Sequence, residues 1–323
     1  MESLYNPCQL CPRECGVNRL EGERGYCGET AQLRLATAGL HFGEEPPLAR
    51  QGGSGTLFIT GCAMGCPFCQ NHQISRGGRG RVVEEEELVR IAQELAKAGA
   101  QNLNLVTPSH AAPALGTFLV PMKAATSLPV AWNSSGYESL EALESVAPSV
   151  NIWLPDLKTL NDETAQRCYG APDYPEAARR AVEWMVNQGE PLVNDQGSMI
   201  QGTMIRHLVL PGELASTRGV LEWFAQNLEG RAWLSLMTQY TPVCIPGEGR
   251  AIPQRQVNEE EYAQILEWLD ELGIDDGYVQ DLVPGDEWLP DFNRTDPFGS
   301  ELSQIIWRWE EGFITPSGRT GSI

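Results

Sequence analysis

The sequence predicts an α/β protein built on parallel strands, preceded by a small cysteine-rich metal-binding unit. Two observations support this class. From Thr56 onward, short apolar runs alternate with amphipathic helical patterns about six times, and seven of the nine cysteines fall within the first seventy positions. An apolar run followed by an amphipathic helix is the repeat of parallel βα units. Six units are too few for a closed eight-stranded barrel.

Each predicted strand is a short apolar run, and each predicted helix carries apolar residues at helical spacing. The strands are expected at residues 56–61, 102–107, 128–133, 151–155, 203–210 and 232–238. The helices are expected at residues 84–98, 111–124, 138–146, 175–188, 216–228 and 258–272. Because active sites of parallel barrels lie at the carboxyl ends of the strands, we expect the functional residues in the loops that follow these strands.

Composition divides the chain into three parts. We expect an N-terminal cysteine-rich metal-binding segment and linker at residues 1–50, a barrel at residues 51–275, and a C-terminal extension at residues 276–323 that packs on the barrel. The linker prediction rests on residues 39–55, which are rich in Gly and Pro. The extension is rich in Pro, Gly and Asp, which is typical of a segment without long regular elements.

The charge balance and the cysteine usage restrict the function. Forty-three acidic against 23 basic side chains give a net charge of -20, which repels phosphate backbones, so we expect no nucleic-acid partner. No apolar run approaches the length of a membrane-spanning helix, and the N-terminus lacks the pattern of a signal peptide. We therefore predict no membrane association and a cytoplasmic location, where nine cysteines indicate metal ligation more than disulfides.

Three cysteines follow the first predicted barrel strand. Cys62, Cys66 and Cys69 have C-x3-C-x2-C spacing directly after the apolar run at residues 56–60. Thiolates are soft ligands that suit iron–sulfur clusters, and three of them hold only three irons of a four-iron cluster. The fourth iron would keep an open coordination position, which is where metal chemistry takes place. A zinc knuckle or a set of buried thiols is the alternative interpretation.

This cysteine loop resembles that of the radical S-adenosylmethionine (SAM) superfamily, in which the same spacing holds a four-iron, four-sulfur cluster that binds SAM. Phe68, just before the third cysteine, also fits the pattern. The closer likeness is to the pyruvate formate-lyase activating enzyme group, in a branch with an extra N-terminal cysteine cluster. The resemblance implies an open, partial (β/α)6 TIM-like barrel and assigns the catalytic cluster to Cys62, Cys66 and Cys69. It also implies that Phe68 lies at the cofactor.

A second set of cysteines lies near the N-terminus. Cys8, Cys11 and Cys15 have C-x2-C-x3-C spacing, and Cys27 follows. Four thiols among Gly, Pro and charged residues cannot form a hydrophobic core, and a metal would supply the missing folding energy. Zinc and a second iron–sulfur cluster both accept four thiolates, so both remain open, and four free structural cysteines are the simpler alternative.

Two of the loops after the strands carry short polar residues. The second strand ends in Thr107-Pro108-Ser109-His110, where the family usually has a Gly-Gly-Glu segment. The third is followed by a segment, residues 133–137, that is similar to the Asn-x-x-Gly-Tyr/Phe segment of the activating enzymes. Because the loop after the second strand departs from the family pattern, it lacks the usual acidic partner for the SAM ammonium, and hydroxyls or carbonyls would accept its protons, with Thr107 and His110 as the candidates. The resemblance implies SAM contacts from Asn133 and Ser135. Judged on the residues alone, both segments are ordinary loops with a helix cap.

Charged residues follow the fourth strand and lie within the fifth. Asp156 and Lys158 are two positions apart, so they share a side of an extended chain, where they can position a zwitterionic ligand. Alternation puts Arg206 and His207 on opposite faces. Similarity to the Asp-x-Lys and Arg-x-x-x-x-Pro-Gly elements of the activating enzymes implies that Asp156, Lys158 and His207 contact SAM. The alternatives are a surface ion pair and a core histidine with satisfied hydrogen bonds.

The resemblance implies an enzyme that reductively cleaves SAM at the cluster to a 5′-deoxyadenosyl radical, which then takes a hydrogen atom from a substrate. The first candidate substrate is a protein glycine in a partner enzyme, with an electron donor of low potential such as flavodoxin or ferredoxin. Radical modification of another peptide or of a small molecule is the alternative. From a different class, a non-catalytic electron-transfer or metal-binding scaffold would bind clusters without cleaving SAM.

Overall fold

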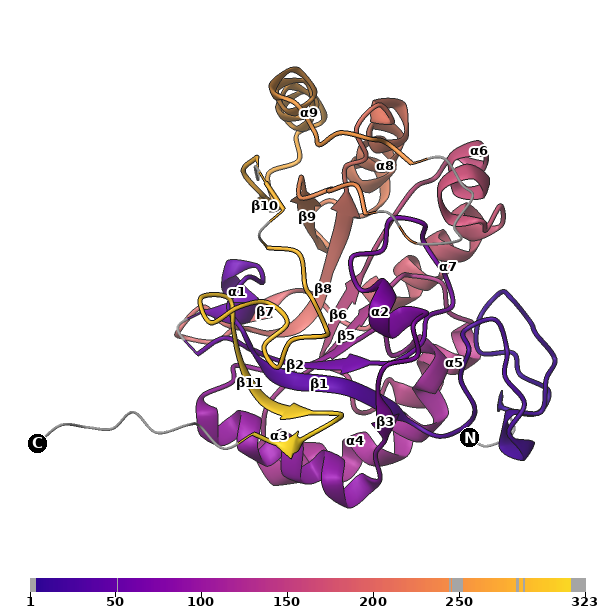
Figure 1. Cartoon of the computed structure of the whole chain (residues 1–323). Helices are drawn as coiled ribbons and strands as arrows, with labels where there is room; N and C mark the ends of the chain where they lie inside the picture. The colour runs from indigo at the N-terminus through magenta and orange to yellow at the C-terminus, as the bar shows by residue number, and fades with distance from the viewer. Residues whose placement is uncertain are drawn as a thin grey trace, which may run out of the picture.

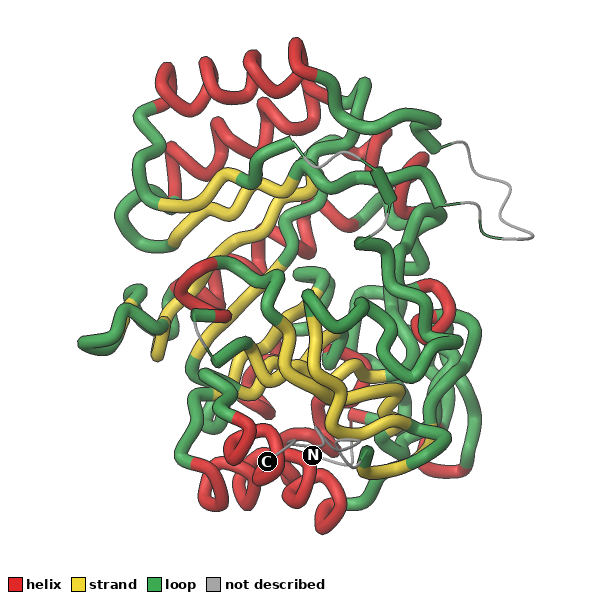
Figure 2. Tube along the Cα trace, turned by 60° about the vertical axis from the view of Figure 1, so that its left-hand side comes forward, coloured by secondary structure: helices red, strands yellow, loops and turns green. Residues whose placement is uncertain are grey.

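A computed structural model describes residues 4–50, 52–243, 245, 252–282, 285–286 and 288–314. Within these residues, strands of one mixed sheet carry helices on their outer side (Figures 1 and 2). The central strands are parallel and follow the order of the chain. They are β2 (Ser54–Ile59), β4 (Leu103–Val106), β5 (Val130–Ser134), β6 (Ile152–Pro155), β8 (Met199–Leu208) and β9 (Trp233–Met237).

Further strands lie at both edges of this parallel set. β10 (Gly277–Val279) extends it beyond β9, whereas β1 (Arg34–His41) runs antiparallel between β2 and β11 (Ser303–Arg308). The remaining strands are β12 (Gly312–Phe313), which pairs with β11, β3 (Arg81–Val82), which pairs with β1, and β7 (Leu192–Val193), which pairs with β8. The described sheet begins at β10 and ends at β12, so it stays open.

The longer helices follow the parallel strands. They are α3 (Glu85–Ala98), α4 (Ala112–Thr126), α5 (Leu140–Val146), α7 (Tyr174–Val186), α8 (Leu214–Asn227) and α9 (Glu259–Leu272). Short helices are α1 (Pro46–Ala49), α2 (His72–Ser75) and α6 (Asp162–Thr164), with 3-10 turns η2 (Arg19–Glu21) and η3 (Ser109–Ala111) and a π-helix η4 (Ala165–Tyr169). Figure 1 shows α3 and α4 at one end of the sheet and α8 and α9 at the other.

Helix α3 illustrates how the sequence sets an element and its place. Its first turn is acidic at residues 85–87, which complements the positive N-terminal end of the helix dipole. Leu88, Ile91 and Leu95 recur at helical spacing and are buried. Gly99 ends the helix in the left-handed conformation that glycine adopts without a steric cost. The helix therefore presents one apolar stripe to the sheet.

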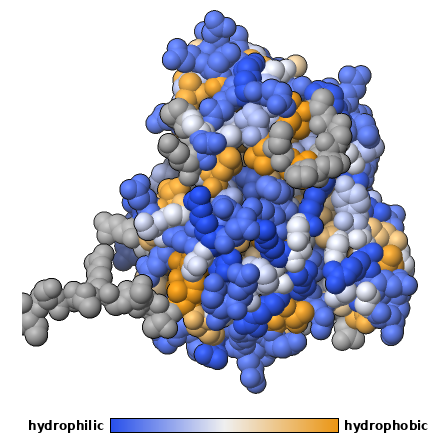
Figure 3. Space-filling model, in the orientation of Figure 1, coloured by the Kyte–Doolittle hydropathy of each residue, from blue (hydrophilic) through white to orange (hydrophobic). Residues whose placement is uncertain are grey.

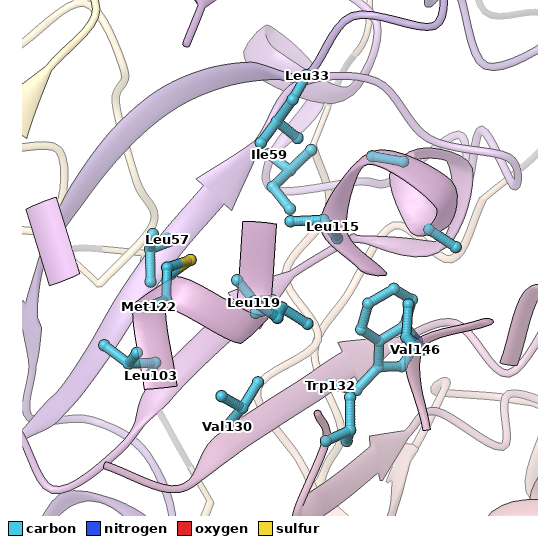
Figure 4. Packing of buried hydrophobic residues seen from close by; sticks show 14 of the residues in the cluster. Leu33, Leu57, Ile59, Leu103, Leu115, Leu119, Met122, Val130, Trp132 and Val146 are labelled. Carbon is cyan, nitrogen blue, oxygen red and sulfur yellow. The ribbon is translucent and has the colours of Figure 1, made fainter. Parts of the chain in front are cut away.

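The main core lies between the sheet and α4. Leu57, Leu103 and Trp132 from three neighbouring strands point toward Leu115 and Leu119 of α4, and all five side chains have no exposed surface (Figure 4). Burying a side chain of this size stabilises the fold by about 1.5–3 kcal/mol. This packing fixes one face of each strand against the helices, so the alternate residues face the interior of the open barrel.

The interior face carries a buried polar network. Arg206 of β8 donates from Nε to Glu45 Oε1 at 2.9 Å and from Nη2 to Glu44 Oε2 at 2.5 Å. Asn104 of β4 donates to Glu44 Oε1 at 3.0 Å, and Ser235 of β9 donates to Glu45 Oε1 at 2.7 Å. The segment that leads into α1 thus reaches inside the sheet and ties three parallel strands together.

The predicted fold class is confirmed. The six predicted strands correspond in order to β2, β4, β5, β6, β8 and β9, and each predicted helix corresponds to one of the longer helices. The remaining described strands were not predicted: β1, which lies in the segment assigned to the N-terminal unit and linker, the short β3 and β7, and β10, β11 and β12 near the C-terminal end. β11 and β12 belong to the predicted C-terminal extension, of which residues 315–323 lie outside the described part.

The face of the molecule seen in Figure 1 is largely hydrophilic, with hydrophobic residues in separate patches (Figure 3). In the part of the chain that the structure describes, no helix has both the length and the apolar character needed to cross a membrane.

Candidate active site

The predicted cluster loop leaves the carboxyl end of β2, all six of whose residues are buried. Gly61 turns the chain there with φ of 93°. A Cβ atom at this position would lie 2.5 Å from Glu29 Cγ and 3.0 Å from the Cys27 carbonyl oxygen, so only glycine fits. The loop therefore starts in contact with the N-terminal cysteine segment.

The three thiols of this loop are half-buried neighbours. Burial raises the pKa of Cys66 to about 12, against the lowering effect of the Lys158 ammonium, and the nearby thiols of Cys69 and Cys62 raise it further. Burial and the Cys62 thiol likewise raise the pKa of Cys69. Cys62 Sγ accepts a hydrogen bond from the Met64 amide at 3.4 Å. These raised pKa values keep the free thiols of Cys66 and Cys69 neutral, and bound metal cations would favour the thiolate form.

This donor set fits an iron–sulfur cluster. In the described part of the chain, no three His, Cys, Asp or Glu side chains converge on a place where they would hold a single metal ion. Each thiolate of a four-iron cluster binds its own iron, so Cys62, Cys66 and Cys69 do not have to meet at one point. Neighbouring soft donors on one loop, with an amide N–H directed at a sulfur, are the chemistry that such a cluster requires.

Phe68 forms an apolar wall beside the cysteines. Its buried ring packs edge-on against Tyr169 and Tyr240, with ring centroids 5.7 Å and 5.3 Å away. Tyr169 ends the π-helix η4, an element that is often found at functional sites. Aromatic pairs of this geometry hold both rings in place and keep water from this side of the loop.

Strand register brings most of the predicted SAM contacts to one edge. Thr107 donates its amide to the Asn133 carbonyl at 2.9 Å, and Asp156 donates its amide to the Ser134 carbonyl at 2.8 Å. Thr107 has φ of 61°, a conformation that is strained for a β-branched residue. Thr107 and Asp156 thus directly follow β4 and β6, and Asn133 lies near the carboxyl end of β5 between them.

Asp156 and Lys158 form an ion pair at this edge. Lys158 Nζ lies 2.6 Å from Asp156 Oδ2, with 16% and 28% of the respective side chains exposed. Burial lowers the pKa of Lys158, but the Asp156 carboxylate and the Cys66 thiol outweigh it and hold this pKa above its ordinary value. The ammonium therefore stays charged and faces the cysteine loop. A charged pair that is still open to solvent can exchange partners with a zwitterionic ligand.

A tyrosine that the sequence reasoning missed anchors this pair. The Tyr174 hydroxyl lies 2.8 Å from the Ser135 carbonyl oxygen and 2.7 Å from that of Asp156, and it accepts a hydrogen bond from the Lys158 amide at 3.0 Å. One side chain at the start of α7 thus fixes the loops after two strands. No sequence signal distinguishes Tyr174 from an ordinary residue of an amphipathic helix.

His207 does not join the other predicted SAM contacts. Its Nδ1 lies 2.7 Å from the Leu157 carbonyl oxygen and its Nε2 lies 3.0 Å from Thr217 Oγ1 of α8, on the helix side of the sheet. Burial lowers the pKa of His207 to about 4. Arg206 points the other way, into the interior network, as alternation requires. The SAM contact predicted for His207 gains no support from this position.

The Thr107–His110 loop packs against the start of the cluster loop. His110 Nε2 lies 2.7 Å from the Thr60 carbonyl oxygen, and Ser109 donates to the buried carboxyl of Glu138 at 2.7 Å. Burial raises the pKa of Glu138. The loop that replaces the usual Gly-Gly-Glu segment is therefore held from both sides.

The N-terminal cysteines are also neighbours. Cys8 is buried and Cys11, Cys15 and Cys27 are half-buried. Burial raises the pKa of Cys11 to about 12, and the other three thiols add to this shift. Cys15 Sγ accepts the Tyr26 amide at 3.2 Å. Described residues 4–33 contain no α-helix, so turns and side-chain contacts hold these thiols.

Arg13 is a second residue that the sequence reasoning missed. Its guanidinium donates to the carbonyl oxygens of Ala63, Met64 and Gly170 at 3.1, 3.3 and 2.8 Å. The contact joins the N-terminal segment to the cluster loop and to the end of η4. The sequence signal for Arg13 is its place between two predicted metal ligands, Cys11 and Cys15.

An open parallel barrel with a three-cysteine loop after its first parallel strand defines a class of metal-dependent barrel proteins. Comparison of the sequence with models of known protein families identifies the family. The family model of the Radical SAM superfamily matches residues 56–223, more than half of the 323 residues. The chain belongs to the Radical SAM superfamily. Membership implies an enzyme with a four-iron, four-sulfur cluster and SAM, and it supports SAM cleavage by a radical mechanism.

Similar proteins include a curated relative and solved structures. "Uncharacterized protein MJ0674" of Methanocaldococcus jannaschii is 28% identical over 281 residues, which cover 85% of this chain and 77% of that protein. Streptococcus suis SuiB bound to S-adenosylmethionine has a TM-score of 0.51 at 11% identity, covering 70% of this chain and 52% of that chain. The hydrogenase maturase HydG of Carboxydothermus hydrogenoformans has a TM-score of 0.50 at 14% identity, with the same coverage of 70% and 52%.

The matched part thus spans about half the length of these two solved chains. At such identities the likeness concerns the fold alone. It agrees with the parallel, open barrel described above.

Proposed function

We propose that Cys62, Cys66 and Cys69 bind the four-iron, four-sulfur cluster and that SAM binds beside it, at the carboxyl ends of β4, β5 and β6. The ion pair of Asp156 and Lys158 carries this proposal. The Lys158 ammonium lies close enough to Cys66 to oppose the rise in the pKa of that thiol, so the pair stands beside the cysteine loop. When bound, the cluster would supply the single electron that cleaves SAM. The residues of this chain bind, orient and shield the two cofactors.

The side chains at this edge match the polar groups of SAM. Lys158 is a donor for the SAM carboxylate, and Asp156 is an acceptor for its ammonium group. The Thr107 hydroxyl and the Asn133 amide offer hydrogen bonds to ribose, while Ser135 lies in the loop that Tyr174 anchors. Phe68 and its aromatic neighbours exclude water from the cysteine loop, and the Tyr169 ring centroid lies 5.9 Å from Lys158 Nζ. We assign His207 a packing role, since both ring nitrogens already have partners.

We further propose that the substrate is a glycine of a partner protein, from which a hydrogen atom is removed to leave a glycyl radical. Support comes from the segments that resemble the activating enzymes, at residues 133–137 and 156–158. An electron donor of low potential, such as flavodoxin or ferredoxin, would reduce the enzyme. The N-terminal cysteines would hold a second metal site, zinc or iron–sulfur, because their segment has little core of its own. A zinc ion would require these thiols to draw together, since in the described residues they do not converge on one point, whereas a cluster binds each thiolate at its own iron.

Electron paramagnetic resonance tests the substrate. The reduced enzyme is mixed without oxygen with SAM and with each candidate partner protein encoded beside it. A glycyl radical gives a stable, oxygen-sensitive doublet on the partner once SAM has been consumed. SAM consumption without a doublet on any such partner would point to another peptide or a small molecule as substrate. Binding of clusters without any SAM cleavage would favour an electron-transfer scaffold.

A further inference from the structure

The N-terminal cysteine segment contacts the cluster loop through one cationic side chain. Two of the carbonyls that Arg13 binds, those of Ala63 and Met64, lie between the predicted iron ligands Cys62 and Cys66. The third, that of Gly170, caps the π-helix that packs on Phe68. One guanidinium therefore spans both structures that surround the cysteine loop.

The guanidinium is held in this position. Its central carbon lies 4.1 Å from the ring centroid of Tyr26 and 5.5 Å from that of Tyr137, so aromatic faces border the cation. The Tyr26 hydroxyl also donates to the Met64 carbonyl at 3.4 Å. A planar group with several fixed donors loses little freedom when it binds several carbonyls at once. An arginine remains protonated, so a positive charge is fixed beside the loop.

We infer that Arg13 positions the cluster loop and raises the reduction potential of the group that Cys62, Cys66 and Cys69 hold. This inference rests on the proposed function. Reduction adds one negative charge, which a fixed guanidinium nearby stabilises, and hydrogen bonding and local charge set the potentials of iron–sulfur clusters. Arg13 lies between Cys11 and Cys15, so the N-terminal segment tunes the cluster of the barrel.

A purely structural role for Arg13 predicts a loss of stability and no change in potential. The variants Arg13→Gln and Arg24→Gln separate the two roles, since each removes one positive charge from the same segment. Arg24 donates to the Gly28 carbonyl at 2.5 Å, a contact within its own segment. The readout is the midpoint potential of the cluster in the full-length, anaerobically reconstituted protein, followed by electron paramagnetic resonance.

Arg13→Gln should make reduction about tenfold less favourable, a shift of about 59 mV to lower potential for one electron. Arg24→Gln should change the reduction equilibrium less than about twofold, because solvent screens an exposed charge. Equal potentials for the two variants would overturn the inference. If Arg13→Gln loses its iron, the variant Arg13→Lys is measured in its place. Lysine lacks the planar donor pair, so the equilibrium constant for reduction should fall about threefold. An unchanged potential in Arg13→Lys would overturn the inference. Failure of the wild-type protein to bind a cluster would instead contradict the proposed function.

Discussion

The two cysteine sets present the same ligands on very different supports. Cys62, Cys66 and Cys69 follow a fully buried strand whose neighbours on both sides belong to one sheet. The N-terminal thiols lie in a segment with one short 3-10 helix, and its buried apolar side chains are few: Tyr5, Cys8, Leu10 and Leu33. Removing metal should therefore leave the barrel loop in place and disturb the N-terminal segment.

The largest effect that tests this comparison concerns the N-terminal segment. Replacing both Cys8 and Cys11 by Ala should remove its metal and lower the free energy of unfolding by several kcal/mol, because metal binding there contributes folding energy. Metal analysis and thermal unfolding measure the two effects. Cys168→Ala, which removes a buried thiol of η4, is the matched control and should keep all metal. Full metal content in the double variant would rule out an N-terminal site.

A smaller effect is expected at the carboxyl ends of the strands. Asp156→Asn should weaken SAM binding about tenfold, because it removes an acceptor for the SAM ammonium and leaves the half-buried Lys158 without its partner. Cluster content should stay at the wild-type level, as measured by iron analysis beside SAM titration. Glu94→Gln is the control, since it breaks the exposed 2.7 Å pair with Lys97. Equal SAM affinity of both variants would contradict the assignment of Asp156.

The dependence of stability on pH tests whether His207 belongs to the core. Burial holds its folded pKa at about 4, below the value of about 6.5 expected when unfolded. Between these values the unfolded chain binds a proton that the folded chain does not, so stability falls as pH decreases. The contribution of this histidine is about 1.4 kcal/mol per pH unit. Denaturant unfolding from pH 6.5 to pH 5 gives the slope of the free energy of unfolding against pH, and this slope should be smaller in His207→Gln than in wild type by that amount. Equal slopes in the two proteins would place the imidazole in solvent.

The smallest effect concerns backbone strain at Thr107. A residue with a Cβ atom pays about 1 kcal/mol in the left-handed conformation at φ of 61°, whereas glycine does not. Thr107→Gly should therefore be more stable than Thr107→Ala by about that amount. The opposite order is expected for Gly and Ala at Glu94 inside helix α3. Chemical denaturation measures the free energy of unfolding of the Gly and Ala variants at residues 107 and 94. If the Ala variant were the more stable one at both positions, the argument for strain at Thr107 would fail.

The barrel could be predicted because its signals are local. Apolar runs and helical spacing identify its strands and helices, and the cysteine spacing identifies its loop. β1 was missed although most of its residues are apolar and buried, because the Gly- and Pro-rich stretch from residue 39 onward was interpreted as a linker. Its pairing with β11 joins positions far apart in the chain and leaves no local signal. Alternation separated Arg206 from His207, but it could not tell which of them faces the interior. The roles of Arg13 and Tyr174 depend on contacts across the fold that leave no pattern in the sequence.

The central claim is that the loop of Cys62, Cys66 and Cys69 supports SAM cleavage. The measurement is iron, sulfide and 5′-deoxyadenosine per chain, in wild type and Cys66→Ala, after anaerobic reconstitution and reduction in the presence of SAM. We expect wild type to form 5′-deoxyadenosine, and Cys66→Ala to lose about four irons and four sulfides and form none. A wild-type protein without sulfide-bearing iron, or a Cys66→Ala variant that still cleaves SAM, would contradict the account.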